Sequence, residues 1–264
     1  MVSIDQSLCI GCNSCVKNCC MGVFVASEER GTAPAIHPRR RCIQCMHCAA
    51  GCPKKAIRFD EFPDYETQVY RDFPENELEQ LIVRRRSIRH FQDTAPDKAL
   101  LQHCMDLASY APSGKNRREW RFTVVYGKEQ VAALRDRCLA LCAEFGEAPE
   151  LPKLMAKGTD LITCGAPCMI LLWSPDDALN PVLDPAVVMS QLELLLVQQG
   201  LGTCWGGYLR QVSDRFPEIR ALLHIPEGCH LRCALMTGYA KNERYPNAIV
   251  HQAPEAYWLE DCGL

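Results

Sequence analysis

Hydrophobic and polar positions follow two different patterns along this chain. Over residues 1–59 the apolar positions show little helical period, whereas from about residue 77 they are spaced as in amphipathic helices that alternate with short apolar runs. Between the two, residues 60–76 contain two prolines and many acidic residues, so we expect a linker there. The pattern therefore predicts a small N-terminal domain at 1–59 and a larger domain at 77–264.

The larger segment is predicted to contain both helices and strands. Leu78, Leu81 and Ile82 lie at positions i, i+3 and i+4, which predicts a helix over 76–86. Further helices are expected over 96–109, 128–142, 152–163 and 213–223, and buried strands at 121–126, 168–173 and 231–239. Because the helices mix irregularly with a few strands, we expect the α+β fold class.

The segment 185–199 is apolar on nearly every side. A helix with this pattern has to be buried all round, either in a core or in a subunit interface.

The composition of the 264 residues narrows the class of protein. Hydrophobic residues make up 48% and charged residues 23%, which is ordinary for a soluble globular chain. The net charge of −3 gives no reason to expect nucleic acid or an acidic membrane as partner. No apolar run reaches the roughly 20 residues of a membrane span, and the first residues do not resemble a secretory signal. We therefore expect a cytoplasmic protein with neither nucleic acid nor membrane as partner.

Cysteine usage departs from this ordinary composition. There are 18 cysteines, and regular cysteine spacing in a chain without a secretory signal favours metal binding over disulfides. The repeats are Cys9-x2-Cys12-x2-Cys15-x3-Cys19 and Cys42-x2-Cys45-x2-Cys48-x3-Cys52-Pro53. A pair of zinc sites is the alternative, but zinc ribbons use two pairs of ligands per ion. Three evenly spaced cysteines plus a fourth, occurring twice, favour iron–sulfur cubanes.

These repeats resemble those of the bacterial two-cluster ferredoxins, over residues 1–59. The resemblance implies that each [4Fe–4S] cluster takes its fourth ligand from the other repeat. It implies the two sets Cys9, Cys12, Cys15 and Cys52, and Cys42, Cys45, Cys48 and Cys19. The sequence departs from the pattern at Cys20, where proline is usual; Cys20 is either a spare thiol, which we favour, or an alternative ligand.

Two segments of the larger domain carry candidate chemistry of a different kind. Arg85, Ser87 and Arg89 alternate along an extended segment, so two cations and a hydroxyl face one side, as suits a phosphate. The small and polar residues of Pro112–Asn116 can bring backbone donors close to a planar polar ring. No GxGxxG or P-loop motif occurs, so we do not expect a Rossmann nucleotide site.

Together with Gly200–Gly207, these segments make the chain from about residue 77 resemble the nitroreductase family of FMN enzymes. The shared blocks are Arg85-Arg86-Ser87-Ile88-Arg89, Pro112-Ser113-Gly114-Lys115-Asn116 and Gly200-Leu201-Gly202-Thr203-Cys204-Trp205. The chain departs from the family at Arg118 and Glu119, where glutamine and proline are usual.

The resemblance also implies where FMN binds. Arg85, Ser87 and Arg89 would grip the FMN phosphate, and Gly206 and Gly207 would lie along the isoalloxazine. Pro112, Ser113, Gly114 and Asn116 would approach the flavin from the partner subunit, because family members are intertwined homodimers. A second phosphate cation would come from Arg244 or Lys241.

The two resemblances together predict an iron–sulfur flavoprotein oxidoreductase. Electrons would pass from two [4Fe–4S] clusters to FMN and on to a small electron-poor acceptor such as a nitroaromatic or a quinone. The built-in clusters favour reduced ferredoxin as donor over NAD(P)H. No residue needs to act covalently, so we assign no catalytic residue. The alternatives are a non-catalytic electron carrier between larger redox complexes and a redox sensor.

Overall fold

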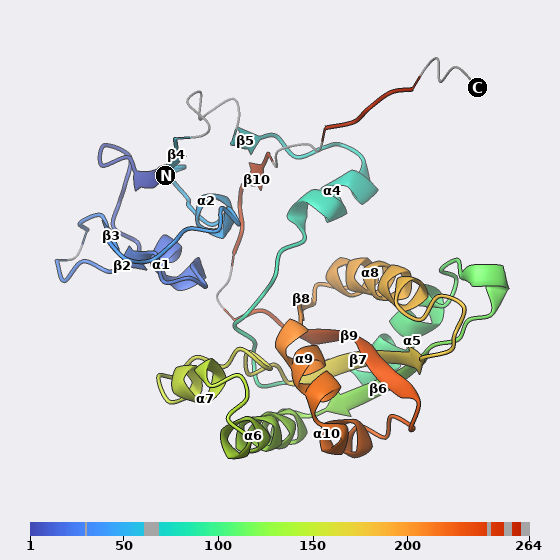
Figure 1. Cartoon of the computed structure of the whole chain (residues 1–264). Helices are drawn as coiled ribbons and strands as arrows, with labels where there is room; N and C mark the ends of the chain where they lie inside the picture. The colour runs from blue at the N-terminus through green and yellow to red at the C-terminus, as the bar shows by residue number, and fades with distance from the viewer. Residues whose placement is uncertain (30, 61–68, 242–243, 251–254, 260–264) are drawn as a thin grey trace. The chain divides into compact units, whose positions relative to one another are not determined.

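The computed structural model describes residues 1–29, 31–60, 69–241, 244–250 and 255–259. The chain divides into two compact units, Met1–Arg84 together with Arg244–Leu264, and Arg85–Glu243 (Figure 1). The first unit thus takes in more than the expected domain at 1–59, because residues 77–84 and a C-terminal segment also belong to it. Most of the expected linker, at 61–68, lies outside the described residues.

The first unit is built from short elements held together by antiparallel pairs. Strand β1 (Val2–Ile4) pairs with β4 (Ile57–Phe59), β2 (Phe24–Val25) with β3 (Ala35–Ile36), and β5 (Tyr70–Arg71) with β10 (Ala248–Ile249). Its helices are α1 (Ser14–Asn18), α2 (His47–Ala50) and α4 (Glu77–Arg84). The core is small, and buried cysteines such as Cys15 and Cys48 are part of it. Metal centres commonly stabilise domains whose apolar core is small.

The second unit contains a four-stranded antiparallel sheet in the order β6-β7-β9-β8. The strands are β6 (Arg121–Tyr126), β7 (Cys168–Pro175), β9 (Cys229–Gly238) and β8 (Gly202–Trp205). The middle strands β7 and β9 are buried over most of their length, which explains why their sequences are apolar runs.

Helices cover both faces of this sheet (Figure 1). On one face lie α5 (Lys98–Ala108) and α8 (Leu183–Gln198), where Val188 and Leu192 share a buried core with Ile170 of β7. The other face carries α6 (Lys128–Glu144), α9 (Gly207–Arg215) and α10 (Pro217–Leu222), and α7 (Glu150–Met155) contacts α6. A single 3-10 turn spans Gly114–Asn116. The mixture confirms the α+β class.

Two of the expected helices are wrong in extent. The helix expected over 152–163 ends at Met155, and a turn follows in which Asp160 accepts hydrogen bonds from the N–H groups of Ile162 and Thr163. The helix expected over 213–223 is two helices, which meet where Phe216 is extended, with φ −115° and ψ 102°. Pro217 causes this break, because proline disfavours the helical conformation in the residue before it.

Helix α8 is not buried all round within the single chain. Leu183 and Val187 lie one turn apart on it and are 67% and 40% exposed. An apolar face of this kind on a soluble domain is typical of an interaction surface. Among the described helices, none is both long enough and apolar enough to span a bilayer.

Candidate functional site

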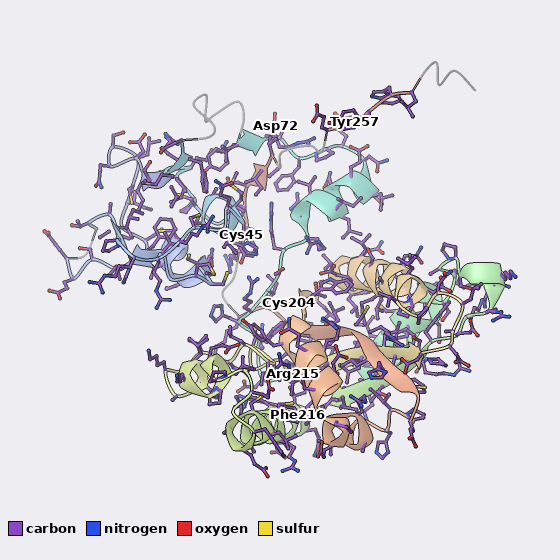
Figure 2. The ribbon with its side chains drawn as sticks, in the orientation of Figure 1. Cys45, Asp72, Cys204, Arg215, Phe216 and Tyr257 are labelled. Carbon is purple, nitrogen blue, oxygen red and sulfur yellow. The ribbon has the colours of Figure 1, made fainter. Side chains whose placement is uncertain are left out.

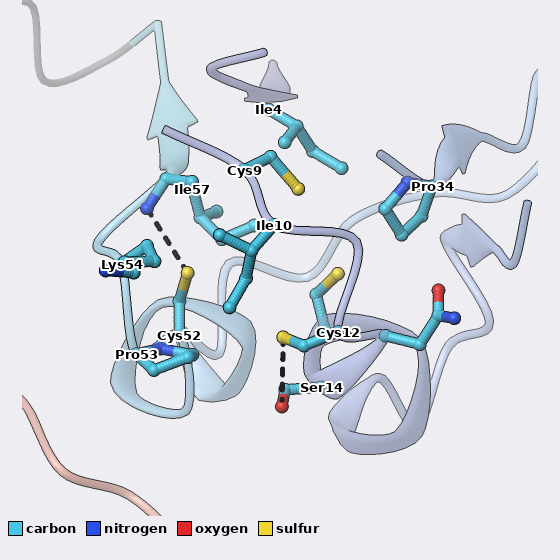
Figure 3. Close-up of a pocket in the computed structure, with 13 residues that line it drawn as sticks. Ile4, Cys9, Ile10, Cys12, Ser14, Pro34, Cys52, Pro53, Lys54 and Ile57 are labelled. Atoms are coloured by element: carbon cyan, nitrogen blue, oxygen red, sulfur yellow. Dashed lines mark hydrogen bonds between the residues drawn. The ribbon is translucent and has the colours of Figure 1, made fainter. Parts of the chain in front are cut away.

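Each predicted ligand set is a crossed set, because it takes three cysteines from one repeat and the fourth from the other. The first crossed set comes together at one cavity of the first unit. Cys9, Cys12, Cys15 and Cys52 line this cavity with Ile4, Ile10 and Ile57 (Figure 3). Burial raises the pKa of the Cys15 thiol to about 12, and the neighbouring thiols of Cys52, Cys12 and Cys9 raise it as well. The Ala56 N–H donates to Cys52 Sγ at 3.2 Å.

The second crossed set is grouped in the same way around Cys48. Burial holds the pKa of this thiol well above its ordinary value, and Cys45, Cys19 and Cys42 add to the effect through their charges. Backbone N–H groups point at two of these sulfurs, from Val23 to Cys19 Sγ at 3.3 Å and from Gln44 to Cys42 Sγ at 3.4 Å.

The two cysteine repeats also share a backbone conformation. Left-handed conformations occur at Gly11, Asn13 and Gly22 in the first repeat, and at the equivalent Gln44, Met46 and Lys55 in the second. Asn13 and Met46 precede α1 and α2, so each repeat turns sharply and then begins one short helix that carries the third cysteine. The sharp turns explain how closely spaced thiols can converge.

Both groups suit an iron–sulfur cluster. The thiol donors and the N–H groups aimed at sulfur, together with the apolar lining of the first group, are the environment that cluster ligands require. Among the described residues, no three His, Cys, Asp or Glu side chains are arranged to hold a single metal ion. Cys20 lies against the second group, since hydrogen bonds from Cys20 and His47 lower the pKa of Cys45 to about 3. The role of Cys20 stays a prediction.

In the second unit, the segment with Arg85, Ser87 and Arg89 lies beside strand β8. Ser87 forms a parallel bridge with Thr203, and the Ile88 N–H donates to the Thr203 carbonyl at 2.8 Å. A Cβ at Gly202 would lie 2.9 Å from the side chain of Ile88, so only glycine allows this approach. The structure therefore joins two of the predicted FMN blocks.

Glu193 of α8 is buried next to this segment, and the sequence analysis did not identify it. Its carboxylate is 3.3 Å from Arg85 Nη1, and it accepts hydrogen bonds from Thr203 Oγ1 and Trp205 Nε1, both at 3.0 Å. A lone acidic residue in the apolar segment 185–199 was the signal that could have revealed it.

Cys164 and Cys204 lie close together beside the arginine segment. Cys164 has a left-handed backbone, with φ 49°, in the turn that Asp160 organises. Cys204 of β8, labelled in Figure 2, is buried. Hydrogen bonding from Cys164, with Arg89 and Ser87 nearby, lowers the pKa of Cys204 to about 7, although burial acts in the opposite direction. Arg89 thus lies close enough to Cys204 to favour a negative charge there, which fits the predicted phosphate site.

The loop at Pro112–Asn116 is held at another part of α8. Gly114 N–H donates to Asp184 Oδ2 at 3.0 Å, and Arg118 folds back onto the loop through Ser113 Oγ at 3.2 Å and Asn116 Oδ1 at 3.1 Å. Asp184 and Glu193 are nine residues apart on α8, which is about 14 Å along the helix. Within one chain, this loop is therefore far from the arginine segment.

The remaining predicted FMN contacts are divided between the units. Gly206 follows β8 directly, and a Cβ at Gly207 would meet no atom within 4 Å, so the surface there is open. The Lys241 N–H donates to the His90 carbonyl at 2.8 Å, in the same unit as Arg89. Arg244 is exposed and belongs to the first unit.

A family model described as the nitroreductase family matches residues 82–239. The chain belongs to the nitroreductase family. A second family model, a 4Fe-4S dicluster domain, matches residues 8–57. The fusion that the sequence predicted is thereby confirmed, and the zinc alternative is set aside. The chain is an oxidoreductase of the nitroreductase family with a 4Fe–4S ferredoxin domain.

Relatives of the nitroreductase domain cover most of its length. A solved nitroreductase with bound FMN from Desulfitobacterium hafniense is 28% identical, with a TM-score of 0.57, over 69% of this chain and 96% of that chain. A protein of Archaeoglobus fulgidus, provisionally named an NADH dehydrogenase/NAD(P)H nitroreductase, is 28% identical over 62% of this chain and 86% of its own length. An iodotyrosine deiodinase of Thermotoga neapolitana is 25% identical over 64% of this chain and 92% of its own.

Proposed function

We propose that this protein passes electrons from two [4Fe–4S] clusters to FMN and on to a small electron-poor acceptor such as a nitroaromatic or a quinone. The observation that carries the proposal is the grouping of eight cysteines into two crossed sets, in a chain that also belongs to the nitroreductase family. Clusters supply one-electron transfer, and FMN supplies both one- and two-electron chemistry. Cytoplasmic location remains the expectation from the sequence.

The cysteines would bind the clusters in the two crossed sets. Backbone N–H groups that donate to Cys52, Cys19 and Cys42 would stabilise the negative charge on the ligating sulfurs. The apolar side chains of Ile4, Ile10 and Ile57 would keep water from the first cluster. In this arrangement Cys20 is a spare thiol beside the second cluster.

FMN would be anchored by its phosphate at the arginine segment. Arg89 and Ser87 lie beside Cys204, and Glu193 orients Arg85. Gly207 would leave space along the isoalloxazine, because a Cβ there would meet no atom within 4 Å. Gly206 would contribute only its backbone, since its missing side chain would face Ala234 at 3.1 Å. The second phosphate cation is Arg244 or Lys241, and a substitution of each would distinguish them.

The proposal includes a homodimer in which one subunit completes the flavin site of the other. In a single chain, the α8 residues that hold the two segments, Asp184 for the Pro112–Asn116 loop and Glu193 for Arg85, lie about 14 Å apart along the helix, whereas FMN would contact both segments. The exposed apolar residues Leu183 and Val187 of α8 supply a surface on which two chains would pack.

The electron donor follows from the fusion. Clusters accept one electron at a time, so we propose reduced ferredoxin as donor, with NAD(P)H as the alternative that the names of relatives suggest. Steady-state assays with reduced ferredoxin, NADH and NADPH, each with the same quinone, distinguish the two. Faster turnover with a nicotinamide than with ferredoxin would contradict the preferred donor.

Anaerobic purification followed by an iron, sulfide and flavin count tests the proposed function. We expect eight irons and one FMN per chain, reoxidation of the reduced clusters when a quinone is added, and turnover in an acceptor screen. Cys52→Ser and Cys48→Ser should each lose about four irons, whereas the matched Cys20→Ser should lose none. A zinc-loaded protein without FMN would refute the proposal, and reoxidation without turnover would indicate an electron carrier.

A further inference from the structure

The C-terminal segment 244–250 is part of the first unit, although it is distant in sequence from the cysteine repeats. In β10, Ala248 and Ile249 are only 1% and 3% exposed and pair with Arg71 and Tyr70 of β5. The Val250 N–H extends this pairing by donating to the Val69 carbonyl at 2.8 Å. We call residues 244–250 the C-terminal strap.

Within the strap, Asn247 binds the end of helix α2. Its side-chain Nδ2 donates to the carbonyl of Cys52 at 2.7 Å and to that of Ala49 at 3.1 Å. Its backbone N–H donates to the carbonyl of Ala50 at 3.1 Å. A side-chain amide has two protons to donate, and both are used here.

Helix α2 needs such donors because it has only four residues. The last carbonyls of a helix have no partner within the helix and must be satisfied from outside. Ala49 and Ala50 are fully buried, so water cannot easily reach their carbonyls. Asn247 donates to the Ala50 carbonyl and adds a donor to the Ala49 carbonyl, which also accepts from the Cys52 N–H at 3.1 Å. Gly51 shows how tight the packing is, since a Cβ there would lie 2.2 Å from Asn18 Nδ2 and 3.4 Å from the Arg244 carbonyl.

The contacts involve both crossed sets. Helix α2 carries Cys48, which belongs to the second set, and runs directly into Cys52, which belongs to the first. A second contact of the strap supports the same region, because the ring of Tyr245 packs edge-on against His47 at 5.4 Å. His47 Nδ1 in turn lies 3.2 Å from the Cys45 carbonyl.

We propose that Asn247 is a positioning residue for both iron–sulfur clusters, which it serves by fixing the turn that joins Cys48 to Cys52. This inference rests on the proposed function in so far as the eight cysteines bind two clusters. It adds that the ferredoxin domain is completed by a strap from the far end of the polypeptide.

The test uses the full-length protein, reconstituted anaerobically, with Asn247→Ala and Asn247→Asp. The aspartate has the shape of asparagine but donates no hydrogen bond, so both variants lose the two amide contacts. We expect both to release iron to a chelator about tenfold faster than the unsubstituted protein, which corresponds to the loss of one or two buried hydrogen bonds. The electron paramagnetic resonance spectra of the reduced clusters should also change.

Asn76→Ala is the matched control, because Asn76 Oδ1 accepts from the N–H groups of Leu78 and Glu79 at the start of α4 in the same unit. This variant tests general destabilisation, and its cluster spectrum should stay unchanged. Iron release and spectra in both Asn247 variants that match the unsubstituted protein would overturn the inference. An iron-free unsubstituted protein would instead refute the proposed function. Unchanged FMN content in the variants would show that the second unit stays folded.

Discussion

Oε1 of Glu193 lies 3.3 Å from Nη1 of Arg85, so a buried carboxylate accompanies the arginine that was expected to bind phosphate. The same carboxylate accepts hydrogen bonds from Thr203 and Trp205. Glu193 therefore connects helix α8 with strand β8 and with the arginine segment. The main role of Glu193 is therefore structural, and the orientation of Arg85 follows from it.

Removal of Glu193 should destabilise the second unit. In Glu193→Ala the buried hydroxyl of Thr203 loses its acceptor, so we expect the free energy of unfolding to fall by about 1–3 kcal/mol. Glu193→Gln keeps an acceptor oxygen and should lose less. Urea denaturation of the FMN-free protein measures both. The exposed Glu227→Ala is the control, and an equal effect in the control would contradict the assignment.

Substitution of Arg89 should weaken FMN binding. Arg89 lies close enough to Cys204 to lower the pKa of that thiol, and a phosphate at the same position would lose a charge-assisted contact in Arg89→Ala. We expect the FMN dissociation constant to rise about 10- to 100-fold, as measured by quenching of flavin fluorescence on titration. The exposed Arg137→Ala on α6 should bind FMN normally. Unchanged affinity in Arg89→Ala would exclude the predicted phosphate site.

The reactivity of Cys204 should depend on Cys164. Hydrogen bonding from Cys164 is the largest cause of the lowered pKa of Cys204, at about 7, so Cys204 becomes a thiolate as the pH rises through neutrality. Cys164→Ala should raise this pKa and so reduce the rate of alkylation at pH 7. Site-resolved mass spectrometry of the alkylated, FMN-free protein gives the pH profile. Cys138→Ala should leave the midpoint of the alkylation pH profile of Cys204 unchanged. If Cys164→Ala also left this midpoint unchanged, the pairing of Cys164 with Cys204 would be contradicted.

A charge on the exposed face of α8 should disrupt the proposed dimer. Val187 is 40% exposed within the chain, and glutamate at this position would be desolvated if two chains pack there. We expect Val187→Glu to be a monomer by light scattering and to bind FMN weakly, because the Pro112–Asn116 loop of a second subunit would be missing. Leu222→Glu on α10 introduces the same charge at another exposed apolar residue and should remain a dimer. A dimeric Val187→Glu would place the interface elsewhere.

Several features of the fold could be predicted because they depend on local sequence. Strand β6 has the predicted bounds, and β7 and β9 overlap their predicted positions, because short runs rich in apolar and β-branched residues favour strands. The expectation that β6 is buried was wrong, since it is an edge strand whose residues are at most partly buried. The predicted helix over 213–223 was wrong because Pro217 restricts its predecessor more strongly than the apolar period favours a continuous helix. Strand β8 was not predicted, since its segment is short and rich in glycine.

The sequence by itself predicted the fusion of a ferredoxin domain with a nitroreductase domain, through the cysteine spacing and the arginine and glycine motifs. It could do so because ligand spacing and close backbone approach are properties of consecutive residues. Only the tertiary structure revealed the partners that are distant in sequence. Glu193 lies beside Arg85, Cys164 beside Cys204, and Asn247 at the end of α2. These contacts arise from chain folding, which brings buried polar groups to whichever segment can satisfy their hydrogen bonds.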